Sequence, residues 1–136
     1  MTPSMKSVVF DSHAILKFAQ DEAGADKVEK LLKASEDGKI RAFINEINLG
    51  EVYYITIRRL GVESARRFLE QFTALAIERV SPSWEIIESA SQIKADFAVS
   101  YADCFATATA LKYNAVIVTG DPEFKRIEHK VEIEWI

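Results

Sequence analysis

Short apolar runs that alternate with helix-patterned segments constrain the fold of this chain more than any other sequence feature. VVF at residues 8–10 and AVIVT at 115–119 are rich in β-branched apolar residues, a composition typical of strands buried on both faces. Two further short strands are predicted at 42–44 and 75–80. The closing segment, 131–135, alternates apolar residues with glutamates, which predicts an edge strand with one solvent-exposed face.

Helical patterns fill the segments between these strands. Strands that alternate with helices imply a mostly parallel sheet covered by helices on both faces, which is an α/β fold. The length of 136 residues suits one domain spanning residues 1–136. Helices are predicted around Ile15–Ala19, in the segment that ends at Gly38, from Asn45 or Asn48 to Leu60, and over 62–72, 82–97 and 100–113.

Four carboxylates that are far apart in the sequence are expected at one edge of this sheet. Asp11 directly follows the first strand, and Asp121 lies two residues beyond the strand 115–119. Asp103 belongs to the first turn of the helix that leads into that strand, and Glu51 to the first two turns of the helix after the second strand. In a parallel sheet, the carboxyl ends of the strands share an edge with the first turns of the returning helices, so these acids meet there.

Such a cluster of acids is costly unless a cation is bound. Two carboxylates ~4 Å apart repel each other by about 4 kcal/mol at an effective dielectric constant of 20. A hard divalent cation reverses that energy, and a ligand set of oxygens without a cysteine–histidine group favours Mg²⁺ or Mn²⁺ over zinc. A cation of this kind can orient a water molecule for attack on a phosphate ester and stabilise the leaving oxygen.

Each acid also has a structural alternative. Asp11 can cap the helix that follows it, and an S-x-x-D sequence makes Asp103 a candidate capping-box residue. Asp121 precedes proline, a pair that favours a turn. Glu51 is alternatively a surface glutamate, with Glu46 as the rival ligand. Capping and metal binding are compatible, because a carboxylate in the first turn of a helix keeps free lone pairs.

Composition limits the cellular setting. The chain is 49% hydrophobic and 28% charged, ordinary values for a soluble protein, and no apolar run approaches the ~20 residues of a membrane span. The N-terminal stretch MTPSMKSVVFD is less apolar than a signal peptide requires. Cys104 is the single cysteine, so no internal disulfide is expected, and the predicted location is the cytoplasm. The net charge of −4 is weak evidence against nucleic-acid binding, because basic residues are clustered.

Four segments together resemble the PIN-domain family. VVFDSHAIL, NLGEVYYI, SYADCFATATAL and VIVTGDPEFKRIE occur in the family's order and spacing, and the resemblance is strongest to the VapC-type toxins of toxin–antitoxin pairs. It covers nearly the whole chain, down to the final IEWI. The resemblance implies a three-layer α/β/α sandwich with a mostly parallel central sheet, and Mg²⁺- or Mn²⁺-dependent cleavage of RNA.

The same resemblance assigns roles to particular residues. Asp11, Glu51, Asp103 and Asp121 match the family's acidic quartet, as catalytic and metal-binding residues. Thr119 matches a hydroxyl residue found just before the last acid. A cognate VapB-type antitoxin, with its C-terminal segment in or near the active-site groove, and a homodimer are implied as partners. The sequence does not say which RNA is cut, whether one or two ions bind, or whether the protein is a toxin or an RNA-processing nuclease.

Other classes fit the sequence less well. A haloacid-dehalogenase-type phosphatase needs a second aspartate at the position of His13, and a receiver domain needs one after the third strand. His13, where the family usually has a small polar residue, either touches substrate or is an incidental loop histidine. A nucleophilic Cys104 has no partner placed by the sequence, and His129 is no better placed than His13. A PIN-like module that binds RNA or protein without cutting is the non-enzymatic alternative.

Surface roles are predicted for two further groups of side chains. Basic residues are candidates for contacts with the RNA backbone, with solvated helix faces as the alternative: Arg58, Arg59, Arg66, Arg67, Lys94 and Lys125. Aromatic residues are candidates for a dimer or antitoxin surface, with core packing as the alternative: Tyr53, Tyr54 and Phe72.

Overall fold

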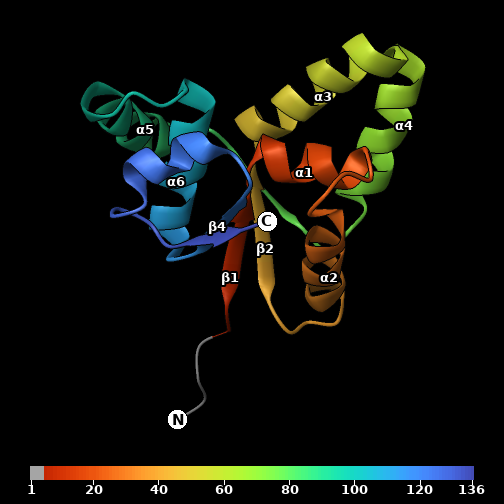
Figure 1. Cartoon of the computed structure of the whole chain (residues 1–136), viewed down its shortest axis with the longest axis horizontal. Coiled ribbons are helices and arrows are strands. Elements are labelled where there is room, and N and C mark those ends of the chain that lie inside the picture. The colour runs from red at the N-terminus through yellow and green to blue at the C-terminus, as the bar shows by residue number, and fades with distance from the viewer. Residues whose placement is uncertain (1–4) are drawn as a thin grey trace.

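Five short parallel strands form the central sheet of the computed structural model, which describes residues 5–136 (Figure 1). The first residues of the N-terminal stretch that we compared with a signal peptide lie outside the described residues. The strand order is β3-β2-β1-β4-β5, and every pairing is parallel. The strands are β1 (Ser7–Phe10), β2 (Arg41–Asn45), β3 (Glu78–Val80), β4 (Val116–Thr119) and β5 (Ile133–Trp135).

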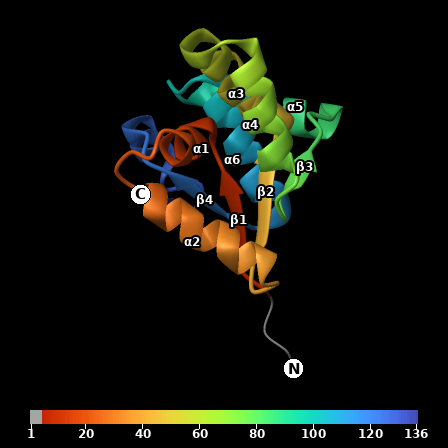
Figure 2. The ribbon, with the colours of Figure 1, turned by 90° about the vertical axis from the view of Figure 1, so that its right-hand side faces the viewer.

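Helices cover both faces of this sheet, which makes the fold a three-layer α/β/α sandwich, as predicted (Figures 1 and 2). One layer contains α1 to α4, and the other contains α5, α6 and the short 3₁₀ helix η1. The helices are α1 (Ser12–Ala19), α2 (Ala25–Glu36), α3 (Glu46–Leu60), α4 (Val62–Thr73), α5 (Trp84–Asp96), α6 (Tyr101–Tyr113) and η1 (Pro122–Ile127).

The alternation of side chains along each strand divides the core in two. Val9 of β1 lies in register with Phe43 of β2 and Ile117 of β4, and all three are fully buried on the side of α5 and α6. The neighbouring residues Val8 and Phe10 are fully buried on the opposite side, against α1 to α4. Each such side chain contributes about 1.5–3 kcal/mol by leaving water. The two apolar strands predicted to be central therefore are central.

Helix ends follow local capping chemistry, which corrects one predicted start and decides between two alternatives for another. The α5 helix begins at Trp84 rather than at Pro82, because the Ser83 hydroxyl caps it by accepting from the Ile86 N–H (3.4 Å). The α3 helix begins after Asn45, the earlier of the two predicted starts, whose side chain accepts from the Ile47 N–H (2.9 Å).

Two other segments differ from the sequence prediction. The predicted strand 75–80 is limited to its last three residues, β3. The GDPEF segment, predicted as a turn, opens the 3₁₀ helix η1. The β5 strand lies at the sheet edge and alternates as predicted: Ile133 and Trp135 pack against the core on the side of α5 and α6, whereas the partly exposed Glu134 forms an ion pair with Lys6 (2.8 Å). None of the helices within residues 5–136 combines the length and apolar character needed to cross a membrane.

Candidate metal centre

The carboxyl edge of the sheet carries the acids that the sequence placed there. Asp11 directly follows β1, and its N–H donates to the Val118 carbonyl of β4 (3.5 Å). Asp121 lies two residues beyond β4. Asp103 is in the first turn of α6, and Glu51 is in the second turn of α3. Helices and strands from distant parts of the sequence thus bring these residues toward one edge.

Thr119, the last residue of β4, connects two of the acids. Its hydroxyl donates to Asp11 Oδ2 (2.5 Å) and accepts from the Asp121 N–H (3.0 Å). Asp11 Oδ1 caps α1 by accepting from the Ala14 N–H (2.8 Å). Asp11 and Thr119 are both fully buried. The hydroxyl residue that the resemblance singled out therefore fixes the orientation of Asp11.

Asp103 belongs to the capping sequence of α6, yet one oxygen of its carboxylate makes no hydrogen bond there. The Ser100 hydroxyl is the cap of α6 and accepts from the Asp103 N–H (3.2 Å). The Asp103 side chain is buried, with 5% of the residue exposed, and among the described residues nothing donates a hydrogen bond to its Oδ2. A buried carboxylate oxygen without a donor is unfavourable unless a cation or ordered water binds it.

Three carboxylates form a cluster that a single ion can bridge. Asp103, Asp121 and Glu123 each offer an oxygen, and these oxygens lie within 4.8 Å of one another; we call these three residues the acid cluster. Asp121 caps η1 and accepts from the Glu123 N–H (3.0 Å), which fixes the two side chains on one turn. Sequence reasoning missed Glu123. The signal was present in D-P-E, where proline starts a tight helix and the next residue is a further acid.

Glu51 and Glu46 take different positions. Glu51 is half-buried, accepts from the Ser12 hydroxyl (2.7 Å), and its charge helps raise the pKa of Asp103. Glu46, the rival ligand in the sequence, instead forms an ion pair with Arg79 (2.8 Å). The structure therefore brings Glu51 near the acid cluster but does not include it among the three oxygens that can share an ion.

Burial raises the pKa of two of these acids. Loss of solvent raises the pKa of Asp11 to about 7, against the opposing hydrogen bond from Thr119, and the charges of Asp103 and Asp121 add to the shift. Loss of solvent also raises the pKa of Asp103 to about 7, followed in size by the repulsion of Asp121, with a smaller part from Glu123. A divalent cation would remove the repulsion and hold both groups ionised.

The residues at this edge fit a hard divalent cation. The ligand atoms of the acid cluster are all carboxylate oxygens, and no donor from the described part of the chain competes for the Asp103 Oδ2 atom. Oxygen ligands of this kind suit Mg²⁺ and Mn²⁺. Cys104 lies next to Asp103, but burial raises the pKa of its thiol to about 11. A protonated, buried thiol is a poor nucleophile and a poor ligand at neutral pH, so Cys104 is a core residue.

His13 lies beside the site without joining it. Its ring packs against Gly120, where an added Cβ would lie 3.0 Å from His13 Cε1 and 3.1 Å from the Ile136 carbonyl oxygen. That close approach explains why glycine precedes Asp121. Burial lowers the pKa of His13, and its Nδ1 is buried with no hydrogen-bond partner among the described residues.

Several predicted surface residues already have partners within the chain. Lys94 Nζ donates to the Val99 carbonyl (2.7 Å), and Arg66 forms an ion pair with Glu63 (2.6 Å). Phe72 is a core residue with 2% exposure, so of the two roles open to it from the sequence, core packing is confirmed. Tyr54 is 45% exposed and remains available for contact with a partner.

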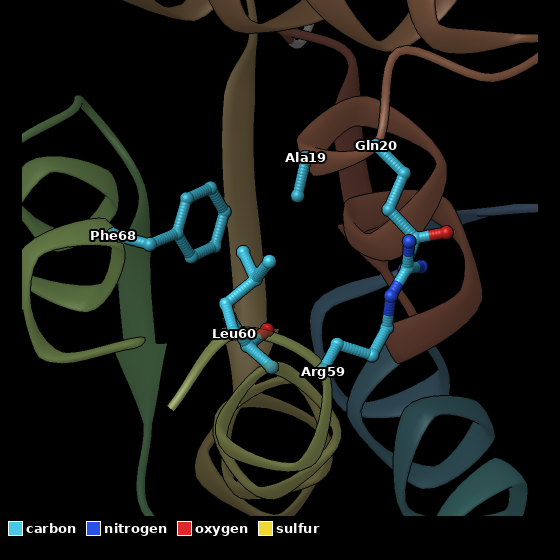
Figure 3. Close-up of a pocket in the computed structure, with 6 residues that line it drawn as sticks. Ala19, Gln20, Arg59, Leu60 and Phe68 are labelled. Atoms are coloured by element: carbon cyan, nitrogen blue, oxygen red, sulfur yellow. The ribbon is translucent and has the colours of Figure 1, made fainter. Parts of the chain in front are cut away.

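An apolar pocket lies between the far ends of α1 and α3 and the side of α4 (Figure 3). Leu60 and Phe68 contribute its apolar surface, and the Arg59 side chain extends along it toward Gln20 (Figure 3). The acid cluster lies at the starts of α6 and η1, whereas this pocket is formed by the C-terminal parts of α1 and α3 and by α4. The pocket is therefore separate from the acid cluster.

Comparison with known families decides the identity of this fold. The family model of the PIN domain matches residues 8–130. This chain belongs to the PIN domain family. The resemblance found in the sequence is thereby confirmed at the level of the family.

Solved structures share the fold of this PIN domain. A chain of DNA-bound VapBC from Salmonella typhimurium superposes with a TM-score of 0.76 at 21% identity, covering 96% of this chain and 98% of that one. A chain of VapBC2 from Rickettsia felis, bound to a promoter DNA fragment, gives 0.74 at 18% identity, with 96% and 98% covered. Mycobacterium tuberculosis VapC20, described as a Sarcin-Ricin loop cleaving toxin, gives 0.70 at 16% identity, with 87% and 92% covered. No protein of curated function matches the sequence significantly.

Proposed function

We propose that this PIN domain is a Mg²⁺- or Mn²⁺-dependent endoribonuclease that hydrolyses single-stranded RNA, and that it is the toxin of a VapBC-type pair. The observation that carries the proposal is the acid cluster: oxygens of Asp103, Asp121 and Glu123 lie within 4.8 Å of one another, and within residues 5–136 nothing donates a hydrogen bond to the buried Asp103 Oδ2. Membership of the PIN family and the VapBC structures with the same fold support it.

The acidic residues would have different roles in such a reaction. Asp103, Asp121 and Glu123 would hold the cation, and Asp11, with its Oδ2 bound by Thr119, would complete the negative edge of the site. When bound, the cation supplies a lowered pKa for water and charge stabilisation at the scissile phosphate. Glu51, which accepts a hydrogen bond from the Ser12 hydroxyl, would orient a water molecule at the rim of the cluster or accept a proton from it.

The proposal is tested with a panel of single-stranded RNAs. We expect cleavage with Mg²⁺ or Mn²⁺, no cleavage with EDTA, and a loss of at least about 100-fold for Asp11→Asn, because general acid–base and metal-positioning groups contribute at that level. Arg41→Ala, at the opposite edge of the sheet, is the control and should cleave normally. Cleavage that persists in EDTA or in Asp11→Asn contradicts the metal mechanism.

Two other functions are compatible with the same fold. A PIN nuclease of cellular RNA processing would carry the same site, and a non-cleaving RNA- or protein-binding module would share the fold. Absence of cleavage on every RNA, together with Mn²⁺ binding, would favour the binding module. A neighbouring reading frame that encodes a DNA-binding antitoxin would favour the toxin.

The proposed partners follow from the same family. A VapB-type antitoxin would block the acid cluster with its C-terminal segment, and the apolar pocket of Figure 3 offers further surface for a bound partner. We also propose a homodimer and a cytoplasmic location. Size-exclusion chromatography with light scattering, with and without a co-expressed antitoxin, measures both assembly states.

A further inference from the structure

Arg126 is the basic residue most closely associated with the acid cluster. Its Nη1 lies 3.8 Å from Glu123 Oε1. Of the ion pairs formed among residues 5–136, only this one includes a carboxylate of the acid cluster. The two residues are three positions apart on the 3₁₀ helix η1, and side chains with this spacing eclipse each other on such a helix. Arg126 therefore projects from the same face of η1 as Glu123.

The guanidinium is anchored by a second element. Arg126 Nη1 donates a hydrogen bond to the Ala98 carbonyl, in the loop that joins α5 to the capping residue of α6. Within the described part of the chain, no hydrogen bond uses the other guanidinium nitrogens of Arg126, and 57% of the side chain is exposed. The group is thus fixed at one nitrogen while the rest of its planar fork faces solvent beside the cluster.

The charge balance of the site calls for such a group. Three carboxylates facing one divalent cation leave a net negative charge, and an incoming phosphodiester adds another. A fixed guanidinium next to the cluster offsets that repulsion, and its paired N–H donors match two oxygens of one phosphate. Anchoring at Ala98 lowers the entropy lost when the phosphate binds, because the side chain is already ordered.

We propose that Arg126 binds a phosphate of the RNA substrate directly beside the acid cluster and holds it there during cleavage. This inference rests on the proposed nuclease function and adds a substrate-binding residue that is absent from the acidic quartet and from the predicted basic contacts. The alternative is purely structural, with Arg126 only tying the α5–α6 loop to η1.

The test compares Arg126→Ala and Arg126→Lys with Arg41→Ala. Arg41 is a matched control, because it is a half-exposed arginine in an ion pair with one glutamate, Glu78, at the opposite edge of the sheet. Binding of a fluorescein-labelled single-stranded RNA of mixed sequence is measured by anisotropy over a range of salt concentrations, with Asp103→Asn added to each protein to prevent cleavage. Mn²⁺ binding is measured by calorimetry on the same variants without Asp103→Asn.

We expect Arg126→Ala to weaken RNA binding about tenfold or more and to reduce the slope of log K against log salt by about 0.7, the value for one lost phosphate contact on a single strand. Arg126→Lys should recover much of the salt slope but not the full affinity, because lysine lacks the planar fork. Mn²⁺ affinity should be unchanged or slightly higher, since a competing cation near Glu123 is removed.

Two results would overturn the inference while leaving the proposed function intact. In the first, Arg126→Ala binds RNA with the same affinity and salt slope as Arg41→Ala. In the second, Arg126→Ala and Arg126→Lys lose Mn²⁺ affinity and thermal stability in parallel with RNA binding, as a purely structural clamp predicts. A protein with native Arg126 that neither binds nor cleaves RNA would instead contradict the nuclease function itself. If Arg126→Ala does not fold, Arg126→Lys carries the same comparison.

Discussion

The backbone and the side chain of Asp103 have different roles, because its N–H takes part in the cap of α6 and its carboxylate belongs to the acid cluster. Its N–H donates to the Ser100 hydroxyl, and within residues 5–136 nothing donates a hydrogen bond to its Oδ2 atom. Burial then raises its pKa, and the neighbouring Asp121 adds repulsion. A group in this state binds a divalent cation strongly, because the cation replaces both the missing hydrogen-bond donor and the missing solvent.

At the residue scale, two glutamates are predicted to differ in their effect on metal binding. Glu123→Gln removes a charge from the acid cluster, whereas Glu51→Gln removes a charge that lies outside it and is bound by Ser12. We expect Glu123→Gln to weaken Mn²⁺ binding about tenfold or more, and Glu51→Gln to weaken it less while still reducing cleavage. Calorimetry and single-turnover kinetics on both variants check this order. Equal losses of Mn²⁺ affinity would show that the cation lies between the two glutamates.

Thr119 provides the second residue-scale prediction. Thr119→Val keeps the shape of the side chain but removes both of its hydrogen bonds, to Asp11 and from the Asp121 N–H. Because the Thr119 hydrogen bond opposes the raised pKa of Asp11, its loss should raise that pKa further. We expect a loss of about 1–3 kcal/mol in stability and an upward shift in the pH at which Mn²⁺ binds. A variant with the native pH dependence would argue that Asp11 does not take part in binding.

At the scale of elements, α6 acts as a rigid support for the site. Its residues from Asp103 to Ala110 are all buried, and small side chains let it pack closely between α5 and the sheet. The hydroxyls of Thr107 and Thr109 are satisfied within the helix by the carbonyls of Asp103 and Phe105 (2.8 and 2.7 Å). The position of Asp103 is therefore set by the packing of a whole helix and by the cap at its start.

Helix capping gives a prediction with an internal control. Ser100→Ala and Ser83→Ala each remove the side-chain cap of one helix, α6 and α5 respectively. Both should cost about 0.5–2 kcal/mol of stability in chemical denaturation. Only Ser100→Ala should also weaken Mn²⁺ binding, because only that cap holds the N–H of a metal-site residue. An equal loss of Mn²⁺ affinity in both variants would point to a general effect of stability instead.

At the scale of the whole molecule, the raised acid pKa values couple folding, pH and metal binding. Asp11 and Asp103 have folded-state pKa values of about 7, above the ordinary aspartate pKa of 3.8. The folded protein therefore binds more protons than the unfolded chain between 3.8 and about 7, so the contribution of these groups to stability falls as pH rises through that window. Above it, the contribution is constant.

The corresponding measurement is the melting temperature from about pH 5 to about pH 8, with EDTA and with Mn²⁺. Without metal, the acids should lower the melting temperature as pH rises. The gain in melting temperature caused by Mn²⁺ should grow over the same range, because the cation binds the ionised carboxylates. Asp103→Asn should reduce the fall in melting temperature with pH in the absence of metal. It should also remove much of the gain in melting temperature caused by Mn²⁺. A Mn²⁺ effect that is the same at both ends of the range would contradict the coupling.

Much of the fold was accessible from the sequence because its signals are local. The β-branched runs of β1 and β4, the glycine at the end of α3 and the serine that caps α6 act within a few residues of their own positions. Boundaries such as the start of α5 were missed by a residue or two, because Ser83 and Pro82 offer competing start signals and only the former provides a capping oxygen.

The sequence by itself determined the succession of strands and helices along the chain. That succession also determined the sheet edge at which Asp11, Glu51, Asp103 and Asp121 gather, because strands that alternate with helices run parallel and end at the same edge. Only the tertiary structure decided which acids can share an ion, grouping Asp103 and Asp121 with Glu123 rather than with Asp11 or Glu51, and which basic side chain lies beside them. The distances between these side chains depend on how η1, the α5–α6 loop and α6 pack together. Contacts between segments that are distant in the sequence produce no local or periodic pattern of residues, so they cannot be recognised from the sequence itself.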